Sequence, residues 1–303
     1  MKHFMQILQE KAKENGPLCV GLDTDPSYIP QEIRSLYDDD SSAVLDFNKR
    51  LIERIADEKT ACCFKVQIAY YEAMGLKGME VYSKTLSYVK QSGLVCISDI
   101  KRGDIAATAS AYARAHFSGD FESDIITINP YMGFDTLKPF TEYCASKGKG
   151  IFVLLRTSNP GMVDIEQKEL VSGERVLDEV GKELERINSE FKKQFPDQTC
   201  SPVGAVVGCT EESDARLLRD KYPEIFFLIP GYGAQGGAAS ICKTLLEKCG
   251  GTVNSSRGIL CAWKKDEDCL KKIENKSITM DDIVEASCRA ARASKKELSF
   301  DGV

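Results

Sequence analysis

A chain of 303 residues with 43% hydrophobic and 28% charged residues has enough apolar material for a large folded core, which excludes a disordered chain. Its net charge of -6 argues against a broad nucleic-acid-binding surface, because such a surface needs clustered Lys and Arg, so any anionic ligand must be held by local groups. No apolar stretch is long enough to span a bilayer, and the amphipathic start lacks the apolar centre of a signal peptide, so we expect a cytoplasmic protein.

Eight short apolar runs recur along the chain, with longer amphipathic stretches between them. Each run has the length and composition of a buried strand, whereas stretches such as residues 43–58 and 79–93 carry apolar residues at helical spacing. The eight predicted strands are residues 17–23, 60–67, 93–100, 124–130, 150–156, 203–208, 225–231 and 251–259.

The alternation of strand and helix indicates a parallel sheet that is covered by helices. Eight such units most simply close into a (β/α)8 TIM barrel of the α/β class, and a doubly wound open sheet is the alternative. No linker or internal repeat divides the chain, so we expect a single domain over residues 1–303. Two polar stretches interrupt the pattern: we expect residues 159–175 to form a lid and residues 262–277 to form a surface insertion.

Charged residues stand at the ends of the first three predicted strands. Asp99 and Lys101 are two positions apart, so both side chains point to the same face of their strand. Asp104 falls in the opening turn of the next predicted helix, while Asp23 and Lys65 end the first and second strands. Such groups are costly to desolvate unless they pair, and barrel enzymes carry their chemistry at this end of the strands. The pattern favours an active site, with a salt-bridge network that only closes the barrel mouth as the alternative.

The last two predicted strands are followed by groups that suit an anion. Residues 230–237, PGYGAQGG, form a Gly-rich turn before a helix, and Arg257 lies in the segment NSSRG. Glycines let backbone N–H groups approach phosphate oxygens, and an Arg can donate a bidentate pair. Barrels often bind phosphate at this place, and the glycine spacing does not match a dinucleotide fingerprint, so we expect a single phosphate monoester.

Other common catalytic chemistries find no support in the sequence. His3 and His116 are the only histidines, and neither ends a predicted strand, so we expect neither histidine acid–base catalysis nor a Ser-His-Asp triad. The twelve cysteines are scattered and form no Cys-x-x-Cys pair, so we expect neither a zinc site nor a disulfide framework.

Several of these motifs occur together in a known family. The segments GLD, FKVQIAYYE and SDIKRGDI, the last with the pattern Asp-x-Lys-x-x-Asp, resemble the orotidine 5'-phosphate decarboxylase family. NPYMG, RTSNPG, PGYGAQGG and SSRG resemble its longer, type 2 branch, and the resemblance runs from about residue 17 to residue 260. It implies a cofactor-free enzyme of de novo pyrimidine biosynthesis that converts orotidine 5'-monophosphate to uridine 5'-monophosphate and CO2. The implied mechanism stabilises a carbanion at C6 of the pyrimidine and protonates it from Lys101.

The resemblance also implies a role for each matched residue, in a homodimer whose subunits share their active sites. Asp104, accompanied by Ile105 and Thr108, would reach into the site of the partner subunit. The implied catalytic residues are Lys65, Asp99, Lys101 and Asp104. The implied substrate-binding residues are Asp23 at the ribose, Ser158 at the pyrimidine, Gln235 and Arg257 at the phosphate, and with them Ala234 of the Gly-rich turn, Ile105 and Thr108.

Two other functions stay open at this point: a magnesium-dependent sugar-phosphate decarboxylase or synthase of the same superfamily, and a non-catalytic nucleotide-binding barrel. The magnesium-dependent relatives carry a metal-binding carboxylate where this chain has Lys65, and a lysine there would repel the ion. The chain also departs from the family pattern Asp-Ile-Gly-Asn-Thr, because Ala106 and Ala107 replace the Gly and the Asn. We therefore expect the start of this helix to pack differently against its partner.

Overall fold

Eight parallel strands follow one another around a closed barrel in the order of the sequence, and β1 pairs with both β2 and β8. The computed structural model describes residues 1–232 and 239–299 of the chain. The predicted (β/α)8 barrel is confirmed, and the alternative of an open sheet is wrong. The strands are β1 (Leu18–Gly21), β2 (Cys63–Gln67), β3 (Val95–Arg102), β4 (Ile125–Ile128), β5 (Gly150–Arg156), β6 (Val203–Val207), β7 (Phe227–Ile229) and β8 (Gly251–Ser255).

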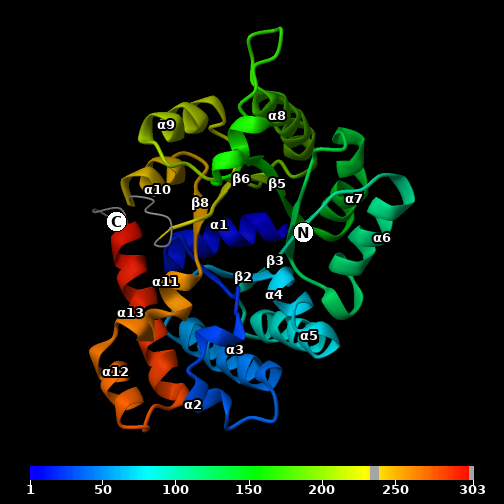
Figure 1. The fold of residues 1–303 in the computed structure, drawn as a ribbon. Helices are drawn as coiled ribbons and strands as arrows, with labels where there is room; N and C mark the ends of the chain where they lie inside the picture. Colours follow the sequence, from blue (N-terminus) through cyan, green and yellow to red (C-terminus); the bar gives the residue numbers. More distant parts are fainter. Residues whose placement is uncertain (233–238, 300–303) are drawn as a thin grey trace.

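Helices surround the barrel, as Figure 1 shows. The α-helices are α1 (Phe4–Asn15), α2 (Gln31–Arg34), α3 (Asp40–Asp57), α4 (Ile68–Glu72), α5 (Gly75–Gln91), α6 (Ala106–Phe117), α7 (Lys138–Lys147), α8 (Val176–Gln194), α9 (Glu212–Lys221), α10 (Ala239–Leu246), α11 (Arg257–Leu260), α12 (Glu267–Glu274) and α13 (Met280–Leu298). Short 3-10 helices are η1 (Pro26–Tyr28), η2 (Gly119–Phe121), η3 (Phe134–Leu137), η4 (Pro160–Asp164) and η5 (Ala262–Lys265).

The first helix, α1, closes the amino-terminal end of the barrel. Its side chains bond to carbonyl groups in the segments that lead into the strands. Asn15 donates to the carbonyl of Ala61 at 3.1 Å, and Gln9 donates to the carbonyl of Cys249 at 2.7 Å. Because those carbonyls precede β2 and β8, α1 is fixed across the end of the barrel that lies opposite the predicted site.

Three strands end at other residues than predicted in ways that bear on the site. β3 continues to Arg102, so Lys101 belongs to the strand itself. β7 covers only three residues, because Pro230 has no N–H to continue the ladder beyond Ile229. β8 ends at Ser255, and Arg257 opens the short helix α11 instead of lying in a strand.

Two apolar cores lie on the two sides of the barrel wall. The register partners Cys19, Cys63 and Val95 point inward and are buried with residues of α1. The residues that follow them in each strand point outward and pack beneath the surrounding helices. In β2 the next inward position is Lys65, which is paired in register with Gly21 of β1. The barrel interior is thus apolar at its amino-terminal end and becomes charged at its carboxyl end.

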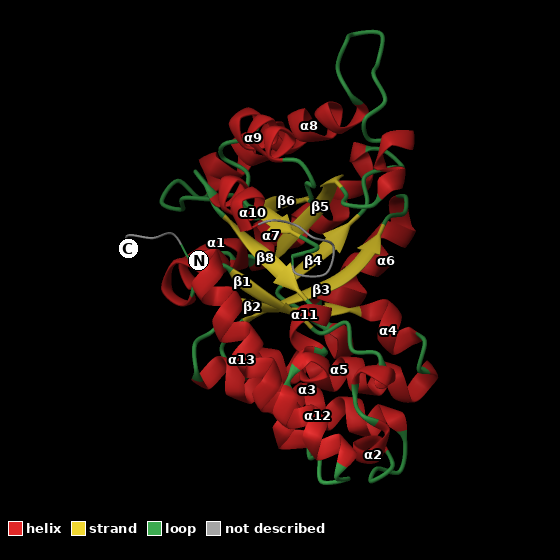
Figure 2. Cartoon of the chain, turned by 60° about the vertical axis from the view of Figure 1, so that its left-hand side comes forward, coloured by secondary structure: helices red, strands yellow, loops and turns green. Residues whose placement is uncertain are grey.

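The two polar stretches that interrupt the sequence pattern have different structures. Residues 159–175 contain η4 and an antiparallel bridge between Glu169 and Arg175, and the segment projects beyond α8 in Figures 1 and 2. Residues 262–277 contain η5 and α12, and the buried Cys269 thiol of α12 contacts the Asp282 carbonyl of α13 at 3.7 Å. The second stretch is therefore a helical cover over α13. None of the helices in residues 1–232 and 239–299 is both long and apolar enough to cross a bilayer.

Candidate active site

Four charged side chains form a continuous set of ion pairs where β1, β2 and β3 end. The Lys65 ammonium donates to Asp23 Oδ1 at 3.0 Å and to Asp99 Oδ2 at 2.9 Å. The Lys101 ammonium donates to Asp99 Oδ1 at 2.6 Å. The signs of charge alternate along this set, so each group is compensated by its neighbour. The structure therefore brings together four of the five charged residues that the strand ends predict.

The two lysines of this set have very different surroundings. The Lys65 side chain is 5% exposed, whereas that of Lys101 is 46% exposed. Burial alone would lower the pKa of Lys65, but the charges of Asp23 and Asp99 outweigh it and hold the pKa above its ordinary value. Lys65 is thus a fixed internal cation, and Lys101 is the cation that a ligand can reach.

Asp99 is the centre of the set and accepts four hydrogen bonds. Thr127 Oγ1 donates to Asp99 Oδ1 at 2.8 Å, and Gln67 Nε2 donates to Asp99 Oδ2 at 3.0 Å, in addition to the two lysines. Burial alone would raise the pKa of Asp99, but the ammonium groups of Lys65 and Lys101 outweigh it and hold the pKa well below its usual range. The carboxylate is therefore ionised and fixed in orientation.

Sequence reasoning missed the neutral partners of the charged set. Gln67 is two residues after Lys65 on β2, a spacing that places both on one face of the strand and could have identified it. Ser256 of the SSRG motif is the exception, because the sequence favours its serines as hydrogen-bond donors, and Ser256 donates to Asp23 Oδ2 at 2.8 Å. Thr127 lies within an otherwise apolar strand, and nothing in that pattern marks it.

A cavity of about 440 Å³ opens beside the charged set at the carboxyl ends of the strands. Ser158 and Arg257, two of the predicted substrate-binding residues, line its wall. Ala234 and Gln235 lie outside the described residues. The described lining residues are Asp23, Tyr28, Lys65, Gln67, Tyr70, Asp99, Lys101, Ser158, Pro230, Gly231, Tyr232, Asn254, Ser256 and Arg257.

Two glycines allow the walls of this cavity to approach closely. A Cβ on Gly21 would overlap Ser256 Oγ, and a Cβ on Gly208 would lie 2.8 Å from Ser158 Cβ. Any side chain at either position would displace a residue that lines the cavity. The Gly of the GLD motif is thus explained by the contact between Asp23 and Ser256, which spans β1 and β8.

Asp104 is not part of the charged set within one chain. It lies two residues before α6, not in the opening turn as predicted, and its Oδ1 accepts the N–H of Ile105 at 2.8 Å. The reason is local: Ala106, at the family's Gly position, has φ 46°, in the left-handed region that disfavours residues with a Cβ. Ile105 is 52% exposed and Thr108 is also exposed, so this segment faces outward.

Comparison with known proteins agrees with this geometry. The model of the Orotidine 5'-phosphate decarboxylase / HUMPS family matches residues 16–268. The chain belongs to this family. An orotidine 5'-phosphate decarboxylase of Clostridium perfringens (strain SM101) is 52% identical over 262 residues, which are 86% of this chain and 90% of that protein. One of Clostridium botulinum (strain Okra) is 50% identical over 268 residues, which are 88% of this chain and 92% of that protein.

Solved structures of the orotidine 5'-phosphate decarboxylase family resemble the chain over nearly its whole length. A Streptomyces avermitilis protein provisionally assigned as orotidine 5'-phosphate decarboxylase superposes with a TM-score of 0.78 at 28% identity, over 98% of this chain and 95% of that one. The OMP decarboxylase of Leishmania donovani superposes with a TM-score of 0.67 at 29% identity, over 93% of this chain and 99% of that one.

Lys65 distinguishes orotidine 5'-phosphate decarboxylation from the magnesium-dependent sugar-phosphate chemistry. Its ammonium lies between Asp23 and Asp99 and donates a hydrogen bond to one oxygen of each. A divalent cation bound there would therefore meet a buried positive charge. Within residues 1–232 and 239–299, no cluster of three or more His, Cys, Asp or Glu side chains could hold a metal ion. The charged set is built for internal pairing, which disfavours the magnesium-dependent alternative.

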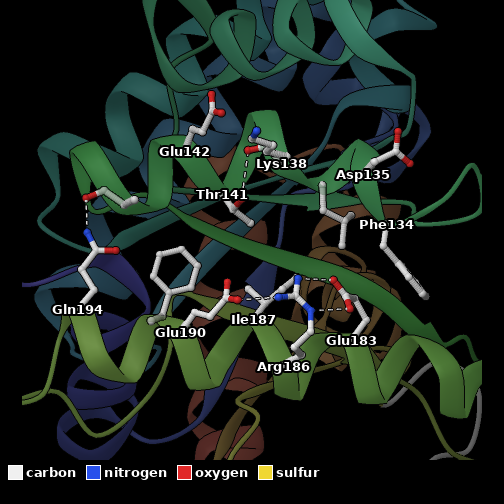
Figure 3. A pocket seen from close by; sticks show the side chains of 13 residues that line it. Phe134, Asp135, Lys138, Thr141, Glu142, Glu183, Arg186, Ile187, Glu190 and Gln194 are labelled. Atoms are coloured by element: carbon white, nitrogen blue, oxygen red, sulfur yellow. Dashed lines mark hydrogen bonds and ion pairs between the residues drawn. The ribbon is translucent and has the colours of Figure 1, made fainter.

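A second hollow, a groove of about 490 Å³ between α7 and α8, lies apart from this site (Figure 3). Three of its charged residues pair with one another: Arg186 donates to Glu183 at 2.7 Å and to Glu190 at 2.6 Å. Exposed pairs of this kind contribute little free energy, and the groove contains none of the strand-end residues. Its exposed Lys138 is therefore suited to a control substitution.

Proposed function

We propose that this member of the orotidine 5'-phosphate decarboxylase family converts orotidine 5'-monophosphate to uridine 5'-monophosphate and CO2. The observation that carries the proposal is the Lys101 ammonium, which is half-exposed to the cavity and held at 2.6 Å by a carboxylate that is itself fixed by Lys65. The curated relatives at about half identity bear the name of this activity.

In the proposed reaction, the bond between C6 and the carboxylate carbon breaks, CO2 leaves, and the electron pair stays on C6. Lys101 stabilises this developing charge and then transfers a proton from Nζ to C6, after which solvent returns a proton to the amine. A fixed ammonium interacts more strongly with the carbanion than with the neutral ring, which is the condition for faster turnover. Repulsion between Asp99 and the substrate carboxylate is a secondary contribution.

The remaining predicted residues would bind the parts of the substrate that do not react. We assign the ribose hydroxyls to Asp23, the pyrimidine to Ser158 and the phosphate to Arg257, and the cavity lining supports these assignments. Ala234 and Gln235 complete the phosphate site in this proposal. No cofactor or metal ion takes part in it. Binding energy from the phosphate would close the segment 159–175, the proposed lid, over the substrate.

The proposed enzyme is a homodimer in which Asp104 completes the site of the partner subunit. Exposed apolar side chains in the segments that follow β3 and β4 support such a contact: Ile105 is 52% exposed, Tyr131 is 76% exposed and Met132 is 50% exposed. Thr108 would lie in the same contact. We also propose a cytoplasmic location, because all twelve cysteines are free and a reducing compartment keeps thiols in this state.

The first experiment follows the loss of orotidine 5'-monophosphate absorbance with purified protein in EDTA. We expect rapid turnover by the wild type and a loss of about 10⁴-fold or more in Lys101→Ala, which removes both charge stabilisation and the proton donor. Lys138→Ala, an exposed lysine in the groove between α7 and α8, is the matched control and should keep full activity. Folded wild type that binds uridine 5'-monophosphate without turnover would support a binding protein, and activity restored only by Mg²⁺ would support the sugar-phosphate alternative.

The shared site has its own test, in which Lys101→Ala and Asp104→Ala chains are mixed and allowed to exchange subunits. Each hybrid dimer contains one site with both wild-type residues, so statistical mixing should restore about a quarter of the wild-type activity. Each variant alone should stay inactive. If the hybrid, verified by tagged purification, has no activity, Asp104 does not act across the subunit interface.

A further inference from the structure

The pairing between β3 and β4 is irregular beside the charged set. Ser98 pairs with Ile126, but the next pair in the ladder is Arg102 with Ile128. Three residues of β3, Asp99 to Lys101, therefore stand opposite the single residue Thr127 of β4. Such bulges leave strand N–H groups without ladder partners and redirect side chains, and they are frequent next to active sites.

The Thr127 hydroxyl replaces the ladder bond that the bulge removes. Thr127 Oγ1 accepts the backbone N–H of Lys101 at 3.0 Å and donates its own proton to Asp99 Oδ1 at 2.8 Å. One hydroxyl thus fixes the main chain of Lys101 and the carboxylate that pairs with the Lys101 ammonium. Thr127 is 1% exposed and does not line the cavity, so its described contacts are internal to the protein.

The main chain of Lys101 requires such a support. Its φ is 45°, in the left-handed region, which is strained for a residue with a Cβ. A residue in this conformation keeps it only where the surroundings hold it in place. The Thr127 hydroxyl is the side-chain acceptor for the N–H of Lys101, and Asn129 N–H donates to the Arg102 carbonyl at 2.8 Å just beyond the bulge.

We propose that Thr127 is a positioning residue for the decarboxylation, which holds Asp99 and the backbone of Lys101 so that the Lys101 ammonium stays at one place in the cavity. This inference rests on the proposed function. A displacement of about 1 Å at a reacting group can cost 10²-fold in rate, so the hydroxyl acts on turnover without touching the substrate. The phosphate and ribose contacts are on other strands, so ground-state binding should be nearly independent of Thr127.

The test compares Thr127→Val, which keeps the shape and loses the hydroxyl, with Thr127→Ser, which keeps the hydroxyl. The matched control is Thr252→Val, because Thr252 is another fully buried barrel threonine whose hydroxyl bonds the Pro17 carbonyl at 2.9 Å at the opposite end of the barrel. For each variant we would measure kcat, KM, the Kd for uridine 5'-monophosphate and the thermal unfolding midpoint.

We expect Thr127→Val to lower kcat by about 30- to 100-fold while the Kd for uridine 5'-monophosphate changes less than about threefold. Thr127→Ser should restore kcat to within about fivefold of the wild type, and Thr252→Val should keep kcat even where its midpoint falls. Equal kcat losses in Thr127→Val and Thr252→Val, a Thr127→Val kcat near that of the wild type, or equal losses of kcat and product affinity would each overturn the proposal.

Thr127→Ala provides a second variant if Thr127→Val does not fold. If neither folds while Thr252→Val does, Thr127 is a folding determinant and the positioning role is wrong. An inactive wild type would instead remove the proposed function itself, so the two failures are distinguishable.

Discussion

The two ends of this barrel use the same strands for opposite purposes. At the amino-terminal end the inward residues are apolar, and Met5 and Leu8 of α1 are fully buried against them. At the carboxyl end the inward positions of β2 and β3 are Lys65 and Asp99, which are also almost fully buried. One or two residues along a strand therefore separate a core that stabilises the fold from charges that are expensive to bury.

The difference in charge indicates which end of the barrel contributes more to the free energy of folding. Burying apolar surface contributes roughly 25 cal/mol per Å², whereas an ion pair that replaces apolar packing in an interior is often neutral or destabilising. Lys65 and Asp99 are thus not explained by stability. In the proposed reaction, their role is to fix the Lys101 ammonium beside the cavity.

The largest difference between the two ends of the barrel is expected when Lys65→Met and Leu8→Ala are compared in stability and in activity. Removing Lys65 leaves Asp23 and Asp99 without their shared cation, which should cost about 3–5 kcal/mol of unfolding free energy. Leu8→Ala removes fully buried apolar volume under the barrel and should cost about 2–5 kcal/mol. Denaturant unfolding would measure both losses.

The two variants should differ in activity although they lose similar stability. At a temperature where both are folded, we expect kcat of Lys65→Met to fall by more than about 10²-fold, because Asp99 loses the partner that orients it. Leu8→Ala should keep wild-type kcat. Equal kcat values for the two folded variants would contradict the division of roles between the ends of the barrel.

The sequence predicted the barrel and part of its charged end, and individual residues explain why the rest of that end was not predictable. The alternating pattern of strands and helices was enough to predict the barrel, and the spacing of Asp99 and Lys101 placed them together at its mouth. The three-to-one bulge opposite Thr127 was not predictable, because it depends on pairing between strands and not on the pattern of either strand. The roles of Ala234 and Gln235 remain predictions.

Segments outside the barrel show the same limit of sequence patterns. Residues 262–277 were predicted only as a polar surface insertion, and the pattern did not predict α12, which Asp266 caps by accepting the N–H of Cys269 at 3.1 Å. The Cys269 thiol and an ion pair between Asp266 and Arg289 join this helix to α13. The position of Asp104 before α6 likewise depends on the left-handed backbone of Ala106. An alanine in the sequence does not predict this conformation, because residues with a Cβ rarely adopt it.

A fall in pH should have a smaller effect, which is a loss of stability at the closed, amino-terminal end of the barrel. His3 caps α1: its Nδ1 accepts the N–H of Gln6 at 3.0 Å, and its Nε2 bonds the carbonyl of Cys200 at 3.0 Å, which together require the neutral ring. Burial lowers the pKa of His3 to about 4, and burial likewise lowers the pKa of His116 to about 4. Because both values lie below the unfolded pKa of about 6.5, the stability they provide is complete above that pH and is lost as pH falls toward 4.

Each histidine should cost about 2 kcal/mol of unfolding free energy between pH 7 and pH 5. His3→Asn keeps an N-cap acceptor that does not titrate in this range, so it should remove about half of the wild-type loss. Denaturant unfolding at pH 7, 6 and 5 measures the slopes, and kcat at pH 7 should be the same in both proteins. An unchanged slope in His3→Asn would mean that His3 is not the group that ties the closed end to pH, whereas a changed kcat would mean that the two ends are coupled.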